Sequence, residues 1–110
     1  MPDQTPKSFF EEKIAQKLKD KPETSKAVNS IYEFNITGEN GGVWTVDLTQ
    51  EPGVVTPGTT GQAKCTVTAT TGDFMNIVSG KMNPQMAFMS GKLKIKGDMG
   101  LAMKLQKVIG

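Results

Sequence analysis

The alternation of apolar and polar residues in the middle of the chain is the strongest constraint on its fold. Every second residue is apolar in 32–36, in 44–48 and in 63–69. Because successive side chains of a β-strand point to opposite faces, each stretch predicts a strand with one buried face. The glycine-rich segment 38–42 joins the first two stretches and predicts a hairpin.

Two shorter stretches extend the predicted sheet to five strands. Residues 54–55 are both valine, and a Pro-Gly pair follows shortly after them. In 92–96, lysines alternate with leucine and isoleucine, which also discourages pairing with the edge of another chain. Cys65 falls on the apolar phase of its strand, so we interpret it as a small core residue rather than as a nucleophile.

Segments with helical periodicity lie on both sides of these strands. Apolar residues recur every four positions in 10–18, after a Thr-Pro pair that is typical of a helix start. Residues 23–29 give a weaker indication of a second, short helix. The segments 70–80 and 83–91 each predict a helix that ends at glycine. A last helix over 98–109 begins with a capping aspartate.

This order of elements predicts one domain, residues 1–110, of the α+β class. The 110 residues are enough for one compact domain and leave little room for a second. A largely antiparallel sheet can expose one face to water while helices cover the other. We therefore expect a five-stranded, mostly antiparallel sheet that about five helices cover on one face.

The predicted last helix has an unusually wide apolar face. At about 100° per residue, its apolar side chains span an arc of about 220°, whereas a helix that rests on a sheet needs about half of that. Gln106 falls inside this arc, so its amide needs a hydrogen-bond partner if it is buried. Such a helix either packs between two layers or lines an internal apolar space, and the pattern alone leaves both open.

Methionine is concentrated in the last third of the chain. Methionine side chains are flexible and polarizable, so they suit surfaces that must fit variable apolar partners, and they specify a rigid core poorly. The concentration therefore indicates either a methionine-rich packed core or an adaptable lipid pocket. Six of the seven methionines are involved, namely Met75, Met82, Met86, Met89, Met99 and Met103.

Several classes of function are disfavoured by residue types that the sequence lacks. The chain has no histidine, and its thirteen basic residues are all lysine. It therefore lacks the commonest general base and metal ligand, and also the guanidinium fork that grips guanine or paired phosphates. No phosphate-binding loop, nucleophile elbow or metal-ligand spacing occurs. We expect no catalytic activity, no cofactor, no metal and no nucleic-acid partner.

Charge is distributed unevenly along the chain. Residues 1–79 hold seven lysines against ten acids, a net charge of −3, whereas 80–110 hold six lysines against one aspartate, a net charge of +5. This indicates either a solvated lysine face or a basic rim for an anionic lipid head, a CoA phosphate or a membrane surface. The sequence shows neither the apolar core of a signal peptide nor a run of about 18 apolar residues. We expect a cytoplasmic monomer.

The segment 80–106 resembles part of a known family. It reads Gly-Lys-Met-Asn-Pro-Gln-Met-Ala-Phe-Met-Ser-Gly-Lys-Leu-Lys-Ile-Lys-Gly-Asp-Met-Gly-Leu-Ala-Met-Lys-Leu-Gln, and this resembles the C-terminal signature of the sterol carrier protein 2 family. Residues 44–48 are similar to the second strand of that family, and 63–67 to its fourth. The resemblance covers most of the chain, and the last third is its most specific part.

The resemblance implies a lipid carrier. Family members fold as a five-stranded sheet with one parallel pair and helices around a hydrophobic tunnel. They bind fatty acids, fatty acyl-CoAs, sterols or phospholipids with little selectivity. Trp44, Gln85 and Gln106 match positions that the family places beside the ligand. The full set of predicted lipid-binding residues is Trp44, Phe74, Ile77, Met82, Gln85, Phe88, Met89, Met99, Leu101, Met103, Leu105, Gln106 and Ile109.

The resemblance leaves the setting of the domain open. Eukaryotic members often end with a peroxisomal signal such as Ser-Lys-Leu, whereas this sequence ends with Val-Ile-Gly. We therefore expect a cytoplasmic carrier, or a peroxisomal one if the chain is a domain of a longer protein. The alternative function is an accessory module that presents substrate to a β-oxidation or other acyl-CoA enzyme, with transient contacts to that enzyme or to an anionic membrane. A thioesterase would need a nucleophile facing the pocket, and the sequence suggests none.

Overall fold

The computed structural model describes residues 5–21, 23–50, 53–98, 100–101 and 103–104. Its elements follow the order that the sequence predicts, and the last two of these segments are helical. The named elements are α1 (Pro6–Ser8), η1 (Phe9–Ile14), α2 (Ala15–Asp20), α3 (Glu23–Val28), β1 (Ile31–Thr37), β2 (Gly42–Asp47), β3 (Val54–Pro57), β4 (Cys65–Thr70), α4 (Thr71–Val78), α5 (Pro84–Met89) and β5 (Leu93–Gly97).

The segments α1, η1 and α2 form the predicted first helix, but η1 is a π-helix. The helix begins at a capping box, because the N–H of Ser8 donates to Thr5 Oγ1 (3.2 Å) and the N–H of Thr5 donates to Ser8 Oγ (3.1 Å). Pro6 occupies the first turn, where no N–H is needed. The π-helical section was not predicted, because Phe10 and Ile14, four residues apart, fall on one face in either helix type.

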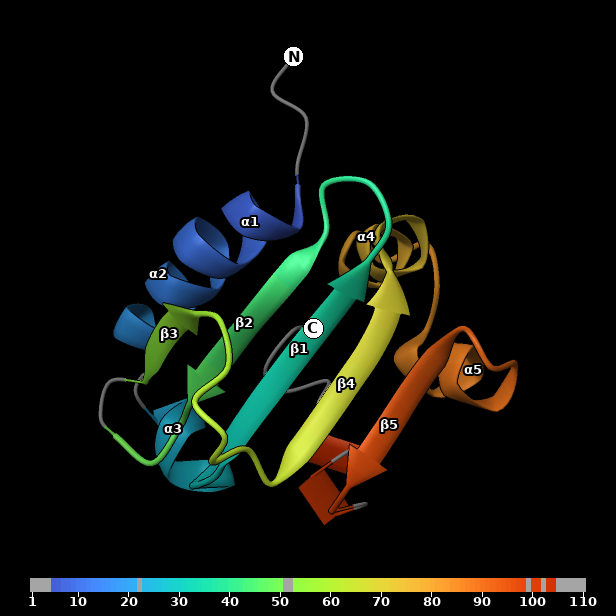
Figure 1. Cartoon of the computed structure of the whole chain (residues 1–110). Coiled ribbons are helices and arrows are strands. Elements are labelled where there is room, and N and C mark those ends of the chain that lie inside the picture. Colours follow the sequence, from blue (N-terminus) through green and yellow to red (C-terminus); the bar gives the residue numbers. More distant parts are fainter. Residues whose placement is uncertain (1–4, 22, 51–52, 99, 102, 105–110) are drawn as a thin grey trace.

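The five strands form one sheet in the order β3-β2-β1-β4-β5 (Figure 1). β1 pairs in parallel with β4, and the other three pairs are antiparallel, so the mostly antiparallel sheet with one parallel pair is confirmed. The register places Phe34 beside Trp44 and Val67, and Val67 beside Ile95. The apolar phases of four strands therefore share one face of the sheet.

The two faces of the sheet are covered differently. Every second residue of β1 and of β4 is buried on the helical face, as the alternation predicts, although β4 begins at Cys65 rather than at Ala63. The segment 58–64, which leads from β3 to β4, crosses the opposite face over β2 and β1 (Figure 1). Thr45 lies on the polar phase of β2 but is buried there, and its hydroxyl donates to the carbonyl of Gly58 (2.7 Å).

The helical segments of the second half begin where the sequence predicts. Thr70 caps α4 and Asn83 caps α5, each through a side-chain oxygen that accepts a backbone N–H. Gly80 follows α4 with a φ of +85°, a conformation that suits glycine after a helix. Asp98 Oδ1 accepts the N–H of Gly100 (2.8 Å), so an aspartate begins the last helical segment.

Candidate lipid-binding site

Two of the predicted site residues, Trp44 and Phe74, belong to a cluster of aromatic rings. Phe10 of η1 stacks against both, with ring centroids 4.9 Å from Trp44 and 5.2 Å from Phe74. Phe34 of β1 lies 4.9 Å from Phe10. The indole N–H of Trp44 donates to Glu11 Oε2 (3.1 Å), so the polar edge of the ring is satisfied. Rings in direct contact leave no space between them for an acyl chain.

Beyond this cluster, the predicted site residues that are buried or half-buried in the described part of the chain are aliphatic or methionine side chains. Ile77 on α4 and Leu101 on the last helical segment, both predicted to line the ligand, are buried. Met82, also in the predicted lipid-binding set, is half-buried, and Met75, which was named only as part of the methionine concentration, packs against the same core. These side chains come from α4, the segment after it and the last helical segment, and all belong to the core or pack against it.

The sheet beneath these side chains is lined by small residues. β4 presents Cys65, Val67 and Ala69 to the helical face, and the one buried residue of α5 is Ala87. β1, by contrast, presents two large aromatic rings and an isoleucine. β4 therefore fills less of the layer between sheet and helices than the rings of β1 do.

The outward side of α5 carries three large apolar side chains. Met86 is 68% exposed, Phe88 39% and Met89 80%, and Gln85 is exposed with them. Gln85, Phe88 and Met89 were predicted to line the ligand, but α5 turns them away from the sheet because Ala87 is its buried residue. The N–H of Lys92 donates to the carbonyl of Ala87 (2.8 Å), which closes the end of α5 just before β5 begins.

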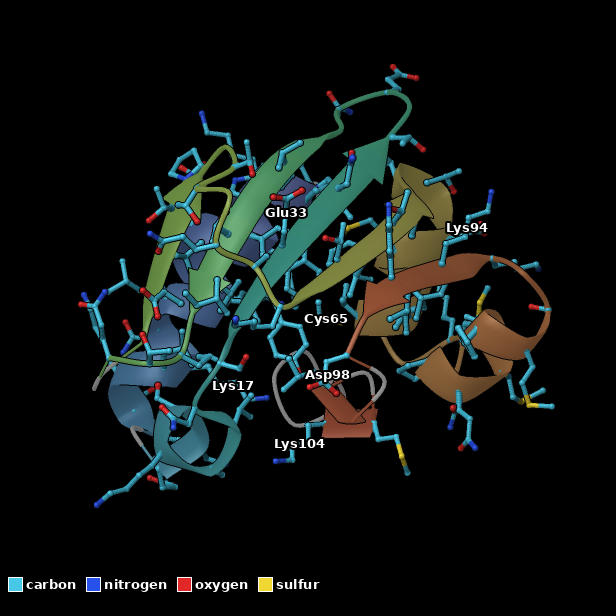
Figure 2. All side chains as sticks on the ribbon, turned by 60° about the horizontal axis from the view of Figure 1, so that its bottom comes forward. Lys17, Glu33, Cys65, Lys94, Asp98 and Lys104 are labelled. Carbon is cyan, nitrogen blue, oxygen red and sulfur yellow. The ribbon has the colours of Figure 1, made fainter. Side chains whose placement is uncertain are left out.

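Hydrogen bonds tie the last helical segment to the sheet. The hydroxyl of Tyr32, on β1, donates to the carbonyl of Leu101, and the N–H of Asp98 donates to the carbonyl of Lys64 (3.0 Å). Figure 2 shows Asp98 and Lys104 on this segment, below Cys65. The sequence pattern predicted only that Tyr32 is buried. Alternation of apolar and polar residues does not indicate which group a buried hydroxyl bonds to. Met103 is exposed on the same segment.

The Cys65 thiol and the Tyr32 hydroxyl at this junction keep their protons near neutral pH. Burial raises the pKa of the Cys65 thiol to about 11, and the negative charge of Asp98 adds to this effect. Burial also raises the pKa of Tyr32, with smaller contributions from Cys65 and Asp98. A buried, protonated thiol is a poor nucleophile, which agrees with the interpretation of Cys65 as a core residue.

Met99, Leu105, Gln106 and Ile109, the remaining predicted site residues, lie outside the described residues. Their predicted role as lining residues stays a prediction. The same holds for the proposed contact between the amide of Gln106 and a ligand oxygen.

A groove on the outer side of the first helix has a different character. Lys17 on its wall has a lowered pKa because it is partly buried and lies near Lys21. The amide of Gln16 donates to Asp20 (2.9 Å) across the same surface. Its charged walls do not suit an acyl chain. The groove is lined by Glu12, Lys13, Gln16, Lys17, Asp20 and Lys21.

Neither a metal centre nor a membrane span is found within the described ranges. No group of three or more His, Cys, Asp or Glu side chains in that part of the chain could hold a metal ion. Of the helices whose residues are described, none has the length and apolar character needed to cross a bilayer.

Comparisons of the sequence with known proteins match nearly the whole chain. The model of the SCP-2 sterol transfer family matches residues 10–110. The chain is 51% identical over 85 residues to hydroxysteroid dehydrogenase-like protein 2 of Homo sapiens, which covers 76% of this chain and 20% of that protein. The chain spans about a fifth of the length of the first curated relatives that it matches.

Two solved structures share the fold. The sterol carrier protein domain 2 of Helicoverpa armigera is 34% identical with a TM-score of 0.71, covering 97% of this chain and 91% of that one. Palmitated SCP2L2 of Aedes aegypti is 28% identical with a TM-score of 0.66, covering 96% of this chain and 95% of that one. The predicted α+β architecture is therefore found in solved structures of similar sequence.

Proposed function

Since the chain belongs to the SCP-2 sterol transfer family, we propose that it binds lipids and transfers them without converting them. The ligands are fatty acids, fatty acyl-CoAs, sterols or phospholipids, held in a hydrophobic tunnel with broad specificity. The observation that carries this proposal is the combination of small strand residues and flexible methionines between the sheet and the helices of the second half.

The proposed tunnel lies beside the aromatic cluster rather than within it. Ile77, Met82 and Leu101 form its described wall, and the outer edge of Phe74 closes it on the aromatic side. Burial of each methylene of an acyl chain is worth about 0.8 kcal/mol, and the ordering of chain and wall offsets much of this. Because these wall residues offer no side-chain hydrogen-bond donors, selectivity among lipids is low.

A structural neighbour supports an acyl chain as ligand. The Aedes aegypti protein with the same fold is described as palmitated. The predicted residues beyond the described part, including Gln106 with its amide, complete the wall in this proposal. Gln106 would then provide the polar contact for an ester, ether or hydroxyl oxygen of the lipid.

We propose that the domain itself is not catalytic. Its single cysteine is buried and its pKa is raised to about 11, so a thiolate is not available near neutral pH. The sequence contains no histidine to serve as a general base. A flat time course of acyl-CoA hydrolysis with the purified protein supports this assignment, and steady turnover would contradict it.

Titration with a fluorescent fatty acid tests the binding function directly. We expect saturable binding at micromolar concentration, and weakening by about tenfold or more in Met82→Asp, because the new carboxylate would be desolvated beside the acyl chain. Val54→Asp is the matched control, because Val54 is exposed on β3 and lies outside the proposed wall. Absence of saturable binding by the wild-type protein would overturn the proposal.

A second candidate function is an accessory module that presents lipid to an enzyme. It is favoured by the relatives, since the matching region is about a fifth of hydroxysteroid dehydrogenase-like protein 2. In that case the pocket is the same, and an enzyme domain in the same polypeptide or a partner enzyme takes the lipid. A lower KM for lipid substrates when the enzyme is joined to this domain, lost in Met82→Asp, would distinguish the module from a free carrier.

A further inference from the structure

We propose that the outward side of α5 is a docking surface for an anionic lipid bilayer. This surface, the α5 face, consists of Met86, Phe88 and Met89. The proposal deepens the transfer function above and rests on it, because a carrier must take up and release lipid at a membrane. It adds a place on the molecule where this contact occurs.

The polarity of α5 is the reverse of what a surface helix normally shows. Its one fully buried residue is Ala87, the smallest side chain of the helix, whereas Met86 is 68% and Met89 80% exposed. At about 100° per residue, the side chains of Met86, Phe88 and Met89 spread over the half of the helix opposite Ala87. The exposed Gln85 lies on the same half, between Phe88 and Met89. Exposed apolar side chains grouped in this way mark an interaction site more often than an isolated apolar residue does.

Hydrogen bonds cap α5 at both ends, and the burial of Ala87 gives its orientation. The N–H of Gln85 donates to Asn83 Oδ1 (2.8 Å) at the start of α5. At its end, the hydroxyl of Ser90 and the N–H of Lys92 both donate to the carbonyl of Ala87, at 3.2 and 2.8 Å. These bonds cap both ends of α5 and define where the helix begins and ends.

The charge around the α5 face selects an anionic surface. Exposed lysines flank the helix on either side in the sequence, Lys81 before it and Lys92 after it. No acidic residue occurs in 80–97, and the next one, Asp98, accepts the N–H of Gly100 at the start of the last helical segment. Lysines beside apolar side chains suit a bilayer that contains anionic phospholipid, where each cation near the surface adds to the attraction.

The chemistry of the side chains favours a bilayer over a protein partner. Methionine adapts its shape to disordered acyl chains, and only Gln85 adds an uncharged hydrogen-bonding group to the exposed side of the helix. α5 also packs beside β5 and next to α4, which belong to the half of the molecule that holds the proposed tunnel (Figure 1). Docking through α5 would bring that half to the membrane surface.

A fluorophore at the α5 face provides the first test. Cys65 is buried, so Met89→Cys introduces an accessible thiol that can be labelled selectively with an environment-sensitive dye. We expect the dye emission to shift to the blue on phosphatidylcholine vesicles that contain phosphatidylserine, and the shift to weaken with added salt. The matched control is Val54→Cys, at an exposed valine on β3, where no shift is expected. An unchanged spectrum at position 89, or an equal shift at position 54, would overturn the proposal.

Substitutions without a label provide the second test. The double variant Met86→Gln and Met89→Gln keeps side-chain length and helix propensity, and we expect it to partition into the same vesicles about tenfold less strongly or worse. Lys81→Gln with Lys92→Gln is expected to reduce binding to the anionic vesicles and leave binding to pure phosphatidylcholine unchanged. Wild-type vesicle binding by the methionine variant would overturn the proposal.

Failure of docking and failure of lipid binding are distinguishable. Fatty acid supplied from solution, without vesicles, is expected to bind the methionine double variant as it binds the wild-type protein. If the variant loses this binding as well, the α5 face belongs to the ligand site and the docking proposal is wrong. If the wild-type protein binds vesicles through α5 but binds no fatty acid, the docking proposal is supported and the proposed transfer function is contradicted.

Discussion

The two halves of the helical face are built from different side chains. In the aromatic half, Phe10 stacks on both Trp44 and Phe74, and Phe34 packs beside them. In the methionine half, formed by β4, β5, α5 and the end of α4 with the segment that follows it, small residues of β4 combine with flexible side chains such as Met82. We therefore assign the aromatic half to fixing the fold, and the methionine half to the proposed lipid site, because methionine side chains adapt to different apolar partners.

Replacement of a ring in the aromatic half should have the largest effect on stability. Phe10→Ala removes a fully buried ring with three aromatic neighbours on the sheet and α4, and we expect the free energy of unfolding to fall by about 3–5 kcal/mol. Met82→Ala, at a half-buried position of the methionine half, should lower it by about 1 kcal/mol. Urea denaturation of both variants measures the difference, and equal losses would break the distinction between the halves.

A smaller effect is expected where the sheet holds the last helical segment. Tyr32→Phe keeps the ring and removes the hydroxyl that donates to the carbonyl of Leu101. We expect a loss of about 1–2 kcal/mol in the free energy of unfolding, since a buried carbonyl loses its partner. Hydrogen exchange should accelerate around Leu101 more than in β1. Uniform acceleration across the sheet would show that the bond stabilises the whole fold and not this junction.

The junction should also weaken in alkaline solution. The pKa of Cys65 is raised by burial, and further by Asp98, from 9.0 to about 11 in the folded protein. The unfolded chain therefore loses the thiol proton first, and the associated stability is complete below pH 9 and is lost as the pH rises towards 11. Tyr32, whose pKa is also raised, acts in the same direction. Denaturant midpoints should fall less steeply with pH in Cys65→Ala, and identical slopes would exclude the thiol as a cause.

The smallest effect on stability is expected on the α5 face. Met86→Gln with Met89→Gln should change the free energy of unfolding by about 0.5 kcal/mol or less, because both side chains are mostly exposed. Thermal and urea denaturation measure this. A loss as large as that of Met82→Ala would mean that the methionines stabilise the fold, and it would remove the reason to assign them to a membrane.

Local patterns predicted most of the fold. Alternation placed Phe34 and Val67 on one buried face, and the caps Asn83 and Asp98 marked where α5 and the last helical segment begin. Thr45 was missed because the segment that buries it comes from beyond β3, and alternation within one strand carries no information about such a cover.

The site was harder to predict than the fold, because it depends on how helices are rotated. Apolar character alone suggested that Phe88 and Met89 point inward with Ile77. The structure instead buries Ala87 and leaves both side chains exposed. Met86 was part of the predicted methionine concentration but not of the predicted lipid-binding set, and it shares a helix face with Met89 at a spacing of three.

Lipid binding by the methionine half can be tested most directly by NMR of the methionine methyl groups during a titration with palmitate. Met75 and Met82 pack against the core of that half, whereas Met86 and Met89 are exposed on α5 and serve as internal references. We predict saturable shifts of the Met75 and Met82 methyl signals, with the Met86 and Met89 signals nearly unchanged. Methyl signals of Met75 and Met82 that stay fixed up to saturating palmitate would contradict a lipid site in this half.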